Sequence, residues 1–111
     1  MAKFAFVQWL LEWLFDSRGW KFEWNKGNET KSKVKHGVAC EEAEEVFRCR
    51  KAIPLGVQIS PKATETRYAV IGITKNGRQL FVSFTLKQGI VRVISARPMS
   101  RKERKLYEEV C

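Results

Sequence analysis

The feature of this sequence that most constrains its fold is a set of four short apolar segments between residues 55 and 95. β-Branched and aromatic residues dominate these segments, as is typical of β-strands. Asn76-Gly77 and Gln88-Gly89 separate the last three, and both pairs favour tight turns between antiparallel strands. The predicted strands are LGVQIS (55–60), TRYAVIGIT (66–74), QLFVSFTL (79–86) and IVRVIS (90–95). A four-stranded antiparallel sheet is therefore the expected centre of the domain.

Helical patterns flank the predicted strands on both sides. Residues 25–36 have the composition of a short polar helix, and an apolar stripe at i, i+4, i+7 and i+8 predicts a second helix that Ile53-Pro54 should end. The stripe consists of Ala39, Ala43, Val46 and Phe47. Ser100 and Glu103 form a capping-box sequence that starts a last helix. This order predicts an α+β fold with helices packed on one face of the sheet.

The apolar run FAFVQWLLEWLF at residues 4–15 predicts an extra helix in front of these elements. Its twelve residues are fewer than the roughly 18–20 that span a bilayer, so no transmembrane segment is expected. The run also lacks the small-residue cleavage site of a secretory signal. It would pack on the domain or on a second copy, lie on a membrane surface, or form an extension without a functional role. Residues 1–19 are therefore assigned as an N-terminal extension, and residues 20–111 as one domain with a single modest core.

The chain is strongly basic. Twenty-one Lys and Arg residues against twelve Asp and Glu residues give a formal net charge of +9. Such a surface attracts nucleic acid, anionic membrane or an acidic protein. The charge is also uneven, because Glu65 is the only carboxylate between Glu45 and Glu103. The strand region and the start of the last helix should therefore present a positive surface.

The sequence offers little material for a metal centre or a hydrolytic triad. Cys40, Cys49 and Cys111 have no C-x-x-C spacing, so neither a disulfide framework nor a zinc site is indicated. A reducing cytoplasm fits this cysteine usage best. His36 and Asp16 are the only residues of their types, which leaves too few groups for a metal-dependent or Ser-His-Asp mechanism. We therefore expect no metal and no cofactor.

Three arginines interrupt or end the apolar strand patterns. Arg67 and Arg92 each share a strand face with isoleucines, and Arg97 has the opposite parity to Arg92 if the last strand stays regular. A guanidinium on an apolar face is unfavourable unless it reaches water, a carboxylate or a ligand phosphate. One interpretation is an ion pair, such as Arg67 with Glu65, that only holds the sheet. The other is that the three arginines converge at one end of the sheet and clamp a phosphate, whose oxygens match forked guanidinium donors.

A phosphate clamp fits RNA cleavage by the substrate's own 2′-hydroxyl. That attack needs no metal and no enzyme nucleophile, but it needs in-line positioning, a base, positive charge on the phosphorane and a donor for the leaving oxygen. Lys35, His36 or Glu65 would transfer protons, and the arginines would carry the charge. His36 also fits a capping or packing role before Gly37.

Further basic residues would contact the RNA backbone or simply form a solvated surface. The candidates for nucleic-acid binding are Lys31, Lys33, Arg78 and Lys87. A non-catalytic nucleic-acid-binding or regulatory module also fits the charge and the scarcity of proton-transfer groups. A membrane-surface protein held by residues 4–15 is a third interpretation.

Short motifs occur in a fixed order over most of the chain. They are F-E-W at 22–24, K-H-G-V at 35–38, E-E-A at 41–43, G-R at 77–78, R-V-I-S-A-R at 92–97 and E-R at 103–104. Together they resemble the BrnT family of bacterial type II toxins, over a stretch from about Trp20 to Glu109. Several separate motifs in one order make the resemblance more specific than any single motif.

The resemblance implies a fold like that of RelE-type ribonucleases and toxicity through RNA cleavage and translation arrest. It also implies neutralisation by a BrnA-like ribbon-helix-helix antitoxin, through which alone the toxin would contact operator DNA. The residues that fall on motif positions or on the matching strands are Lys35, His36, Arg67, Arg92 and Arg97. Glu65 lies outside the motifs, and its assignment rests on the chemistry alone.

Overall fold

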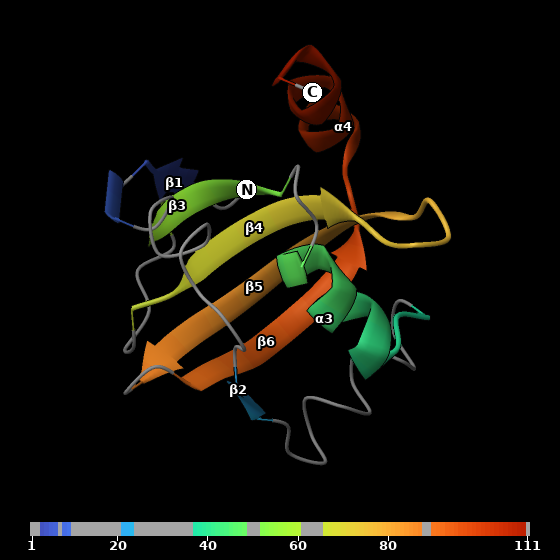
Figure 1. Ribbon diagram of the computed structural model, residues 1–111. Coiled ribbons are helices and arrows are strands. Elements are labelled where there is room, and N and C mark those ends of the chain that lie inside the picture. Colours follow the sequence, from blue (N-terminus) through green and yellow to red (C-terminus); the bar gives the residue numbers. More distant parts are fainter. Residues whose placement is uncertain are drawn as a thin grey trace.

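The computed structural model describes residues 3–6, 8–9, 21–23, 37–48, 52–60, 66–87 and 90–110 (Figure 1). The elements among these residues are β1 (Lys3–Ala5), β2 (Lys21–Glu23), α3 (Cys40–Arg48), β3 (Ile53–Ser60), β4 (Tyr68–Ile73), β5 (Gln79–Lys87), β6 (Ile90–Pro98) and α4 (Arg101–Val110). The predicted α+β class is confirmed. So are the four central strands, the helix at α3 and the capped helix at α4.

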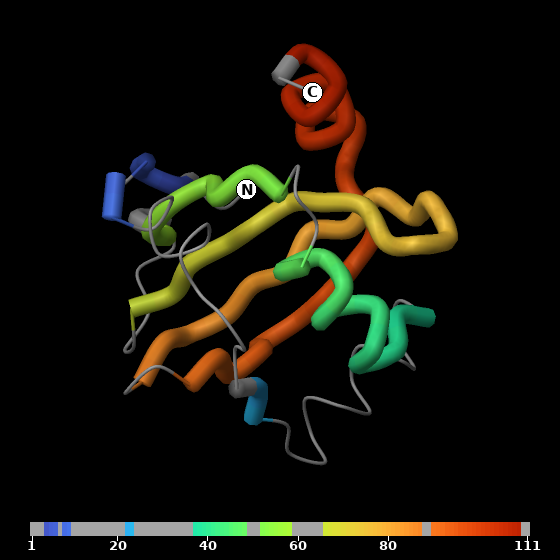
Figure 2. The backbone as a smooth tube through the Cα atoms, in the orientation of Figure 1, coloured from blue at the N-terminus to red at the C-terminus, as the bar shows by residue number. Residues whose placement is uncertain are grey.

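The sheet is larger than predicted and mixed in direction. Its strand order is β1-β3-β4-β5-β6-β2, and every neighbouring pair is antiparallel except β2 and β6, which run parallel. Figure 2 shows the two N-terminal strands at opposite edges of the sheet. Each has only three residues, too few for the alternating pattern from which a strand is recognised in sequence. The prediction of a purely antiparallel four-stranded sheet was therefore wrong at both edges.

The N-terminal apolar run also differs from its prediction. Phe4 and Ala5 belong to β1, so the helix expected over residues 4–15 does not begin there. The ring of Phe4 packs edge-on against Phe81, with centroids 5.9 Å apart, and this burial together with pairing to β3 favours the strand. Gln8 and Trp9 are helical, while residues 10–15 and the helix predicted at 25–36 lie outside the described residues. None of the described helices is long and apolar enough to cross a membrane.

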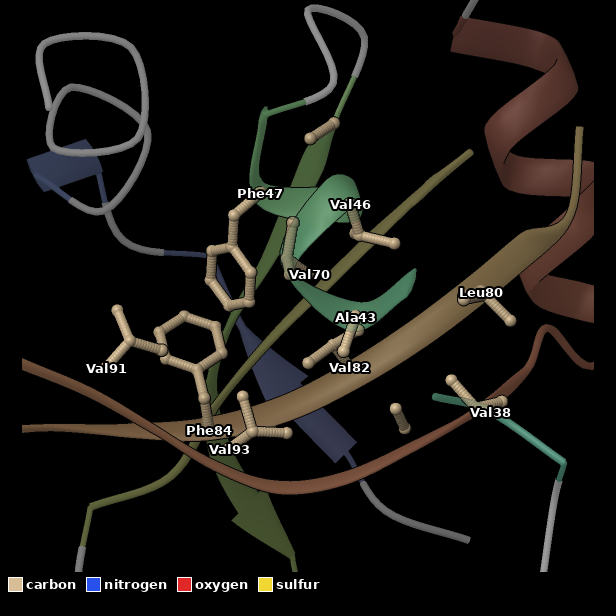
Figure 3. Packing of buried hydrophobic residues seen from close by; sticks show 12 residues of the cluster. Val38, Ala43, Val46, Phe47, Val70, Leu80, Val82, Phe84, Val91 and Val93 are labelled. Atoms are coloured by element: carbon tan, nitrogen blue, oxygen red, sulfur yellow. The ribbon is translucent and has the colours of Figure 1, made fainter. Parts of the chain in front are cut away.

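The main core lies between α3 and one face of the sheet (Figure 3). Ala43, Val46 and Phe47 of α3 are fully buried there, as their helical spacing predicted. The ring of Phe47 packs edge-on against Phe84 at 4.9 Å. Gly72 allows the close approach of α3, because a Cβ at that position would lie 3.0 Å from Cγ1 of Val46. The helix is thus fixed against the middle of the sheet.

The opposite face of the sheet carries a smaller apolar cluster under α4. Tyr107 of α4 and Met99 are buried there with Ala69, Ile71 and Phe81. Because residues alternate between faces along a strand, Ala69 and Ile71 point away from the side that α3 covers. The expectation that the helices share one face was therefore wrong. Because the strands carry apolar residues on both faces, each face of the sheet must pack against another element.

A β-bulge in β6 changes which of its residues share a face. Ser83 pairs with Ser95 whereas Phe84 pairs with Val93, so Ile94 is the extra residue. The extra residue reverses the alternation beyond this point. Arg92 lies opposite Thr85 and Arg97 lies opposite Phe81, which places both arginines on the same face. The parity expected for a regular strand does not apply here.

Candidate functional site

A cleft of about 460 Å³ opens at the end of the sheet where β5 ends and β6 begins. Four strands, β2, β4, β5 and β6, contribute to its walls, together with one residue just before β4. The described residues that line it are Glu23, Thr66, Tyr68, Thr85, Leu86, Lys87, Ile90 and Arg92. Its walls therefore combine cationic, hydroxyl and aromatic groups with one carboxylate.

Sheet register places three polar residues of the cleft in one row. Glu23 is the parallel partner of Arg92, and Arg92 is the antiparallel partner of Thr85. Tyr68 pairs with Phe84, so one further step along the same register brings Arg67 opposite Thr85. Directly paired residues share a face, and neighbouring strands are about 4.8 Å apart. By this extension of the register, Arg67 would lie on the same face of the sheet as Arg92.

Arg92 has an unsatisfied donor in this cleft. Its Nε is buried, and no acceptor in the described part of the chain reaches it. A buried N–H without a partner is unfavourable by about 1–3 kcal/mol, and more for charged groups. A ligand oxygen in the cleft would relieve that cost only if the Arg92 side chain turned its Nε towards the cleft. Phosphate oxygens are well suited, because guanidinium N–H groups form short charge-assisted hydrogen bonds with them.

Tyr68 forms an aromatic wall of the cleft. Its ring packs edge-on against Trp9 with centroids 5.4 Å apart and lies 5.7 Å from the ring of Phe84. Burial raises the pKa of the Tyr68 hydroxyl above its ordinary value, so this group stays protonated at neutral pH. Tyr68 is therefore a hydrogen-bond donor and a stacking surface in the cleft, and not a proton acceptor at neutral pH.

Arg97 lies in a different part of the molecule. Its Nη1 and Nη2 donate hydrogen bonds of 2.8 and 2.9 Å to the two carboxylate oxygens of Glu103, and Nη1 also donates to the carbonyl of Pro98 at 3.0 Å. The guanidinium carbon lies 4.0 Å from the centroid of the Phe81 ring. Arg97 lines a smaller groove of about 200 Å³ with Phe4 and Glu103. The predicted clamp of three convergent arginines is therefore not formed.

Glu103 joins this ion pair to the start of α4. Its carboxylate accepts a hydrogen bond from the backbone N–H of Ser100 at 2.8 Å, and its own N–H donates to the Ser100 hydroxyl at 3.2 Å. The predicted capping box is thus present. Burial raises the pKa of the Glu103 carboxyl, but the hydrogen bonds and charge of Arg97 and the bonds from Ser100 outweigh it. The resulting pKa lies below the ordinary value.

A comparison with protein families identifies the relatives of this chain. The profile of the family described as the ribonuclease toxin BrnT of type II toxin–antitoxin systems matches residues 24–103. The chain belongs to the BrnT family. A search of curated proteins finds no significant match. BrnT membership makes the protein a relative of ribonuclease toxins, and a type II toxin implies a protein antitoxin as partner.

The BrnT match includes all three arginines, but the structure separates their environments. Arg92 lines the cleft, whereas Arg97 is paired with Glu103 near α4. Arg67 lies in the chain between the cleft residues Thr66 and Tyr68. Lys87 lines the cleft as well. The other predicted site residues lie outside the described residues, namely Lys31, Lys33, Lys35, His36 and Glu65. In the chain, His36 directly precedes Gly37, and Glu65 directly precedes the cleft residue Thr66.

Arg78, a predicted nucleic-acid contact, is engaged within the protein. Its Nη1 donates to both carboxylate oxygens of Glu42, at 2.9 and 2.8 Å, and to the carbonyl of Gly37 at 3.1 Å. These bonds tie the β4–β5 turn to the residues that lead into α3. Arg78 therefore anchors the chain at the start of α3, next to the K-H-G-V motif of the BrnT family.

Sequence reasoning missed Glu23 as a cleft residue. Its carboxylate belongs to a three-residue strand whose partner, β6, is distant in the chain. The only signal was its position within the F-E-W motif at 22–24. The matched part of the BrnT profile begins one residue later, at residue 24. Thr85 was also missed as a cleft residue, because it lies within a largely apolar strand sequence.

Proposed function

We propose that this BrnT-family protein is an endoribonuclease toxin that cleaves RNA by attack of the substrate's 2′-hydroxyl on the adjacent phosphate, without a metal ion. The observation that carries the proposal is the open cleft of about 460 Å³ that Arg92 and Lys87 line together with Thr85. Cations and donors that are fixed in such a cleft stabilise negative charge that grows on a phosphorane. Family membership supplies the class of activity.

The cleft supports a division of roles among its cations. Arg92 is proposed to hold the scissile phosphate, with Arg67 beside it in the same row of the sheet. Lys87, at the end of β5, adds a cation that guides the RNA backbone into the cleft. Lys35, His36 and Glu65 remain the proposed proton-transfer groups from motif position and chemistry. Arg97 is proposed to support the reaction indirectly, because Glu103 occupies its donors.

The biological setting follows from the family as a proposal. RNA cleavage in the cytoplasm would arrest translation, and a BrnA-like ribbon-helix-helix antitoxin would neutralise the toxin. Operator DNA would be contacted only through that antitoxin. The chain has 21 basic and 12 acidic residues. This excess of positive charge favours binding to an acidic partner surface and would hold the free toxin on RNA by electrostatic attraction. A relation to the RelE-type ribonuclease fold belongs to the same proposal.

The decisive experiment uses purified protein and a labelled single-stranded RNA in buffer that contains EDTA. We expect cleavage products that end in 2′,3′-cyclic phosphate and 5′-hydroxyl groups, because the nucleophile comes from the RNA itself. An otherwise identical strand with 2′-O-methyl groups should bind but remain intact. Cleavage of the methylated strand, or a requirement for added divalent metal, would contradict the mechanism. Binding without any cleavage would instead identify a non-catalytic nucleic-acid-binding module.

A further inference from the structure

The carboxylate of Glu23 occupies a position in the cleft that the cationic residues cannot fill. Glu23 ends β2, and its parallel pairing with Arg92 puts both side chains on one face of the sheet. Both residues line the same cleft. Arginine and lysine are protonated at neutral pH and have no lone pair to accept a proton, whereas an ionised carboxylate has two acceptor oxygens. Among the described lining residues, Glu23 is the only carboxylate.

Glu23 is also available for chemistry. Its residue is exposed, and within the described ranges it takes part in none of the ion pairs. Those ion pairs engage Glu42, Glu44 and Glu103 with arginines elsewhere in the molecule. Arg92, its partner in register, likewise keeps an unpaired Nε. A carboxylate and a guanidinium thus line one cleft without neutralising each other, which leaves both ready for a substrate.

We propose that Glu23 is the general base of RNA cleavage, a role that rests on the ribonuclease function proposed above. Glu23 takes the proton of the 2′-hydroxyl as the 2′-oxygen forms its bond to phosphorus. The bond from phosphorus to the 5′-oxygen then breaks, and the departing oxygen takes up a proton from one of the other proposed proton-transfer groups, such as Lys35 or His36, which regains it from solvent. Glu23 returns its proton to solvent, so the step consumes no co-reactant. The products are a 2′,3′-cyclic phosphate and a 5′-hydroxyl.

The groups around Glu23 fit this division of labour. Among the residues that the structure describes, the charged and titratable ones that line the cleft with it are Tyr68 of β4, Lys87 of β5 and Arg92 of β6. Arg92 is placed to hold the phosphate beside the base, because the two residues are direct partners in the sheet. Thr85, the partner of Arg92 on its other side, offers a neutral hydroxyl donor. Base and anion-binding group are therefore adjacent in one row.

The test compares Glu23→Gln with the parent protein and with Glu109→Gln, a control that removes an exposed carboxylate on α4. Cleavage of a labelled single-stranded RNA is followed as a function of pH. Binding is measured by anisotropy with the uncleavable 2′-O-methyl strand. We expect Glu23→Gln to cleave roughly 10²–10⁴-fold more slowly and to lack the decline in rate on acidification that we expect of the parent. Affinity for the methylated strand should stay within about threefold, since phosphate contacts dominate binding.

Two further results complete the test. Glu23→Asp should retain part of the rate, because it keeps a carboxylate at a slightly different distance. The Glu109→Gln control should match the parent. A Glu23→Gln protein that cleaves at the parental rate, keeps the parental pH profile, or loses affinity as much as rate would overturn the assignment of Glu23 alone. A parent protein that cleaves no RNA under any of these conditions would instead overturn the ribonuclease proposal itself.

Discussion

The side chains of Arg92 and Arg97 project from the same face of β6 but have different surroundings. Arg92 keeps a buried, unpaired Nε in the open cleft, while Arg97 donates hydrogen bonds of 2.8 and 2.9 Å to the carboxylate of Glu103. The bulge at Ile94 puts them on one face, and their positions on either side of it separate them along the strand. Substitution of the two arginines should therefore affect different properties of the protein.

Arg92→Ala should impair cleavage while leaving the fold intact. The guanidinium would stabilise the transition state, so its removal should lower the cleavage rate at least about 100-fold. Stability should change little, because the substitution also removes a buried unsatisfied donor. Initial rates and thermal unfolding of the same preparations measure the two effects. Arg104→Ala, which removes an exposed cation on α4, is the matched control and should leave the rate near that of the parent.

Arg97→Ala should primarily destabilise the protein. It would break the bidentate pair with Glu103 and the contact with the Phe81 ring, at an expected cost of about 1–3 kcal/mol. A double-mutant cycle with Glu103→Ala, followed by urea denaturation, should give a coupling energy of about 1 kcal/mol or more. Additive effects of the two substitutions would show that the pair contributes nothing to stability. Loss of cleavage in a fully stable Arg97→Ala protein would restore Arg97 to the catalytic site.

Glu103 should make the protein sensitive to acid. Its folded-state pKa lies below the ordinary value of 4.5, so the folded state favours the ionised form. The resulting stabilisation is complete above the unfolded-state pKa and is lost as the pH falls through the folded-state pKa. The difference in unfolding free energy between the parent and Glu103→Gln should therefore shrink as the pH is lowered from 6 towards 3. Glu108→Gln on the exposed side of α4 serves as the control.

Arg78→Ala should loosen the start of α3. The substitution removes the hydrogen bonds to Glu42 and to the Gly37 carbonyl, and we expect a loss of about 1–2 kcal/mol of unfolding free energy. Lys75→Ala removes an exposed cation from the same turn and should leave stability nearly unchanged. If both substitutions lower RNA affinity equally, Arg78 has no special contact with RNA. A much larger affinity loss for Arg78 would contradict a purely structural role.

Gly56→Ala should disrupt the pairing of β1 with β3. Gly56 has a φ of +113°, and a Cβ there would overlap the carbonyl oxygen of Ala5. The combined strain and overlap should destabilise the protein by about 2–4 kcal/mol. Gly77 also has a positive φ, of +84°, but its Cβ would face open space, so Gly77→Ala should cost only about 1 kcal/mol. Urea denaturation of both variants separates the effect of overlap from that of backbone strain.

Local patterns predicted the centre of the fold. The β-branched and aromatic runs of β4 to β6, the turn at Gly77, the stripe of α3 and the capping box at Ser100 each depend on neighbours within a few residues. They could therefore be recognised without knowledge of tertiary contacts.

The remaining features depend on partners that are distant in the chain. Phe4 adopts a strand because β3 and Phe81 are beside it, although its spacing suits a helix. The bulge at Ile94 leaves no mark in an apolar run, and it decides where Arg97 points. Glu103 was expected to cap α4, but its simultaneous hold on Arg97 required the strand and helix to be seen together.

The two N-terminal strands form the outer edges of the sheet, and this arrangement has a consequence for biosynthesis. The partner of β2 is the segment Ile90–Arg92. During synthesis on the ribosome, β2 therefore cannot pair until most of the polypeptide has emerged. Pairings between such distant segments form late, because a large loop must close first. Glu23 meets Arg92 only at that moment. A nascent or prematurely terminated chain therefore lacks the assembled cleft, which would delay the proposed nuclease activity until synthesis is nearly finished.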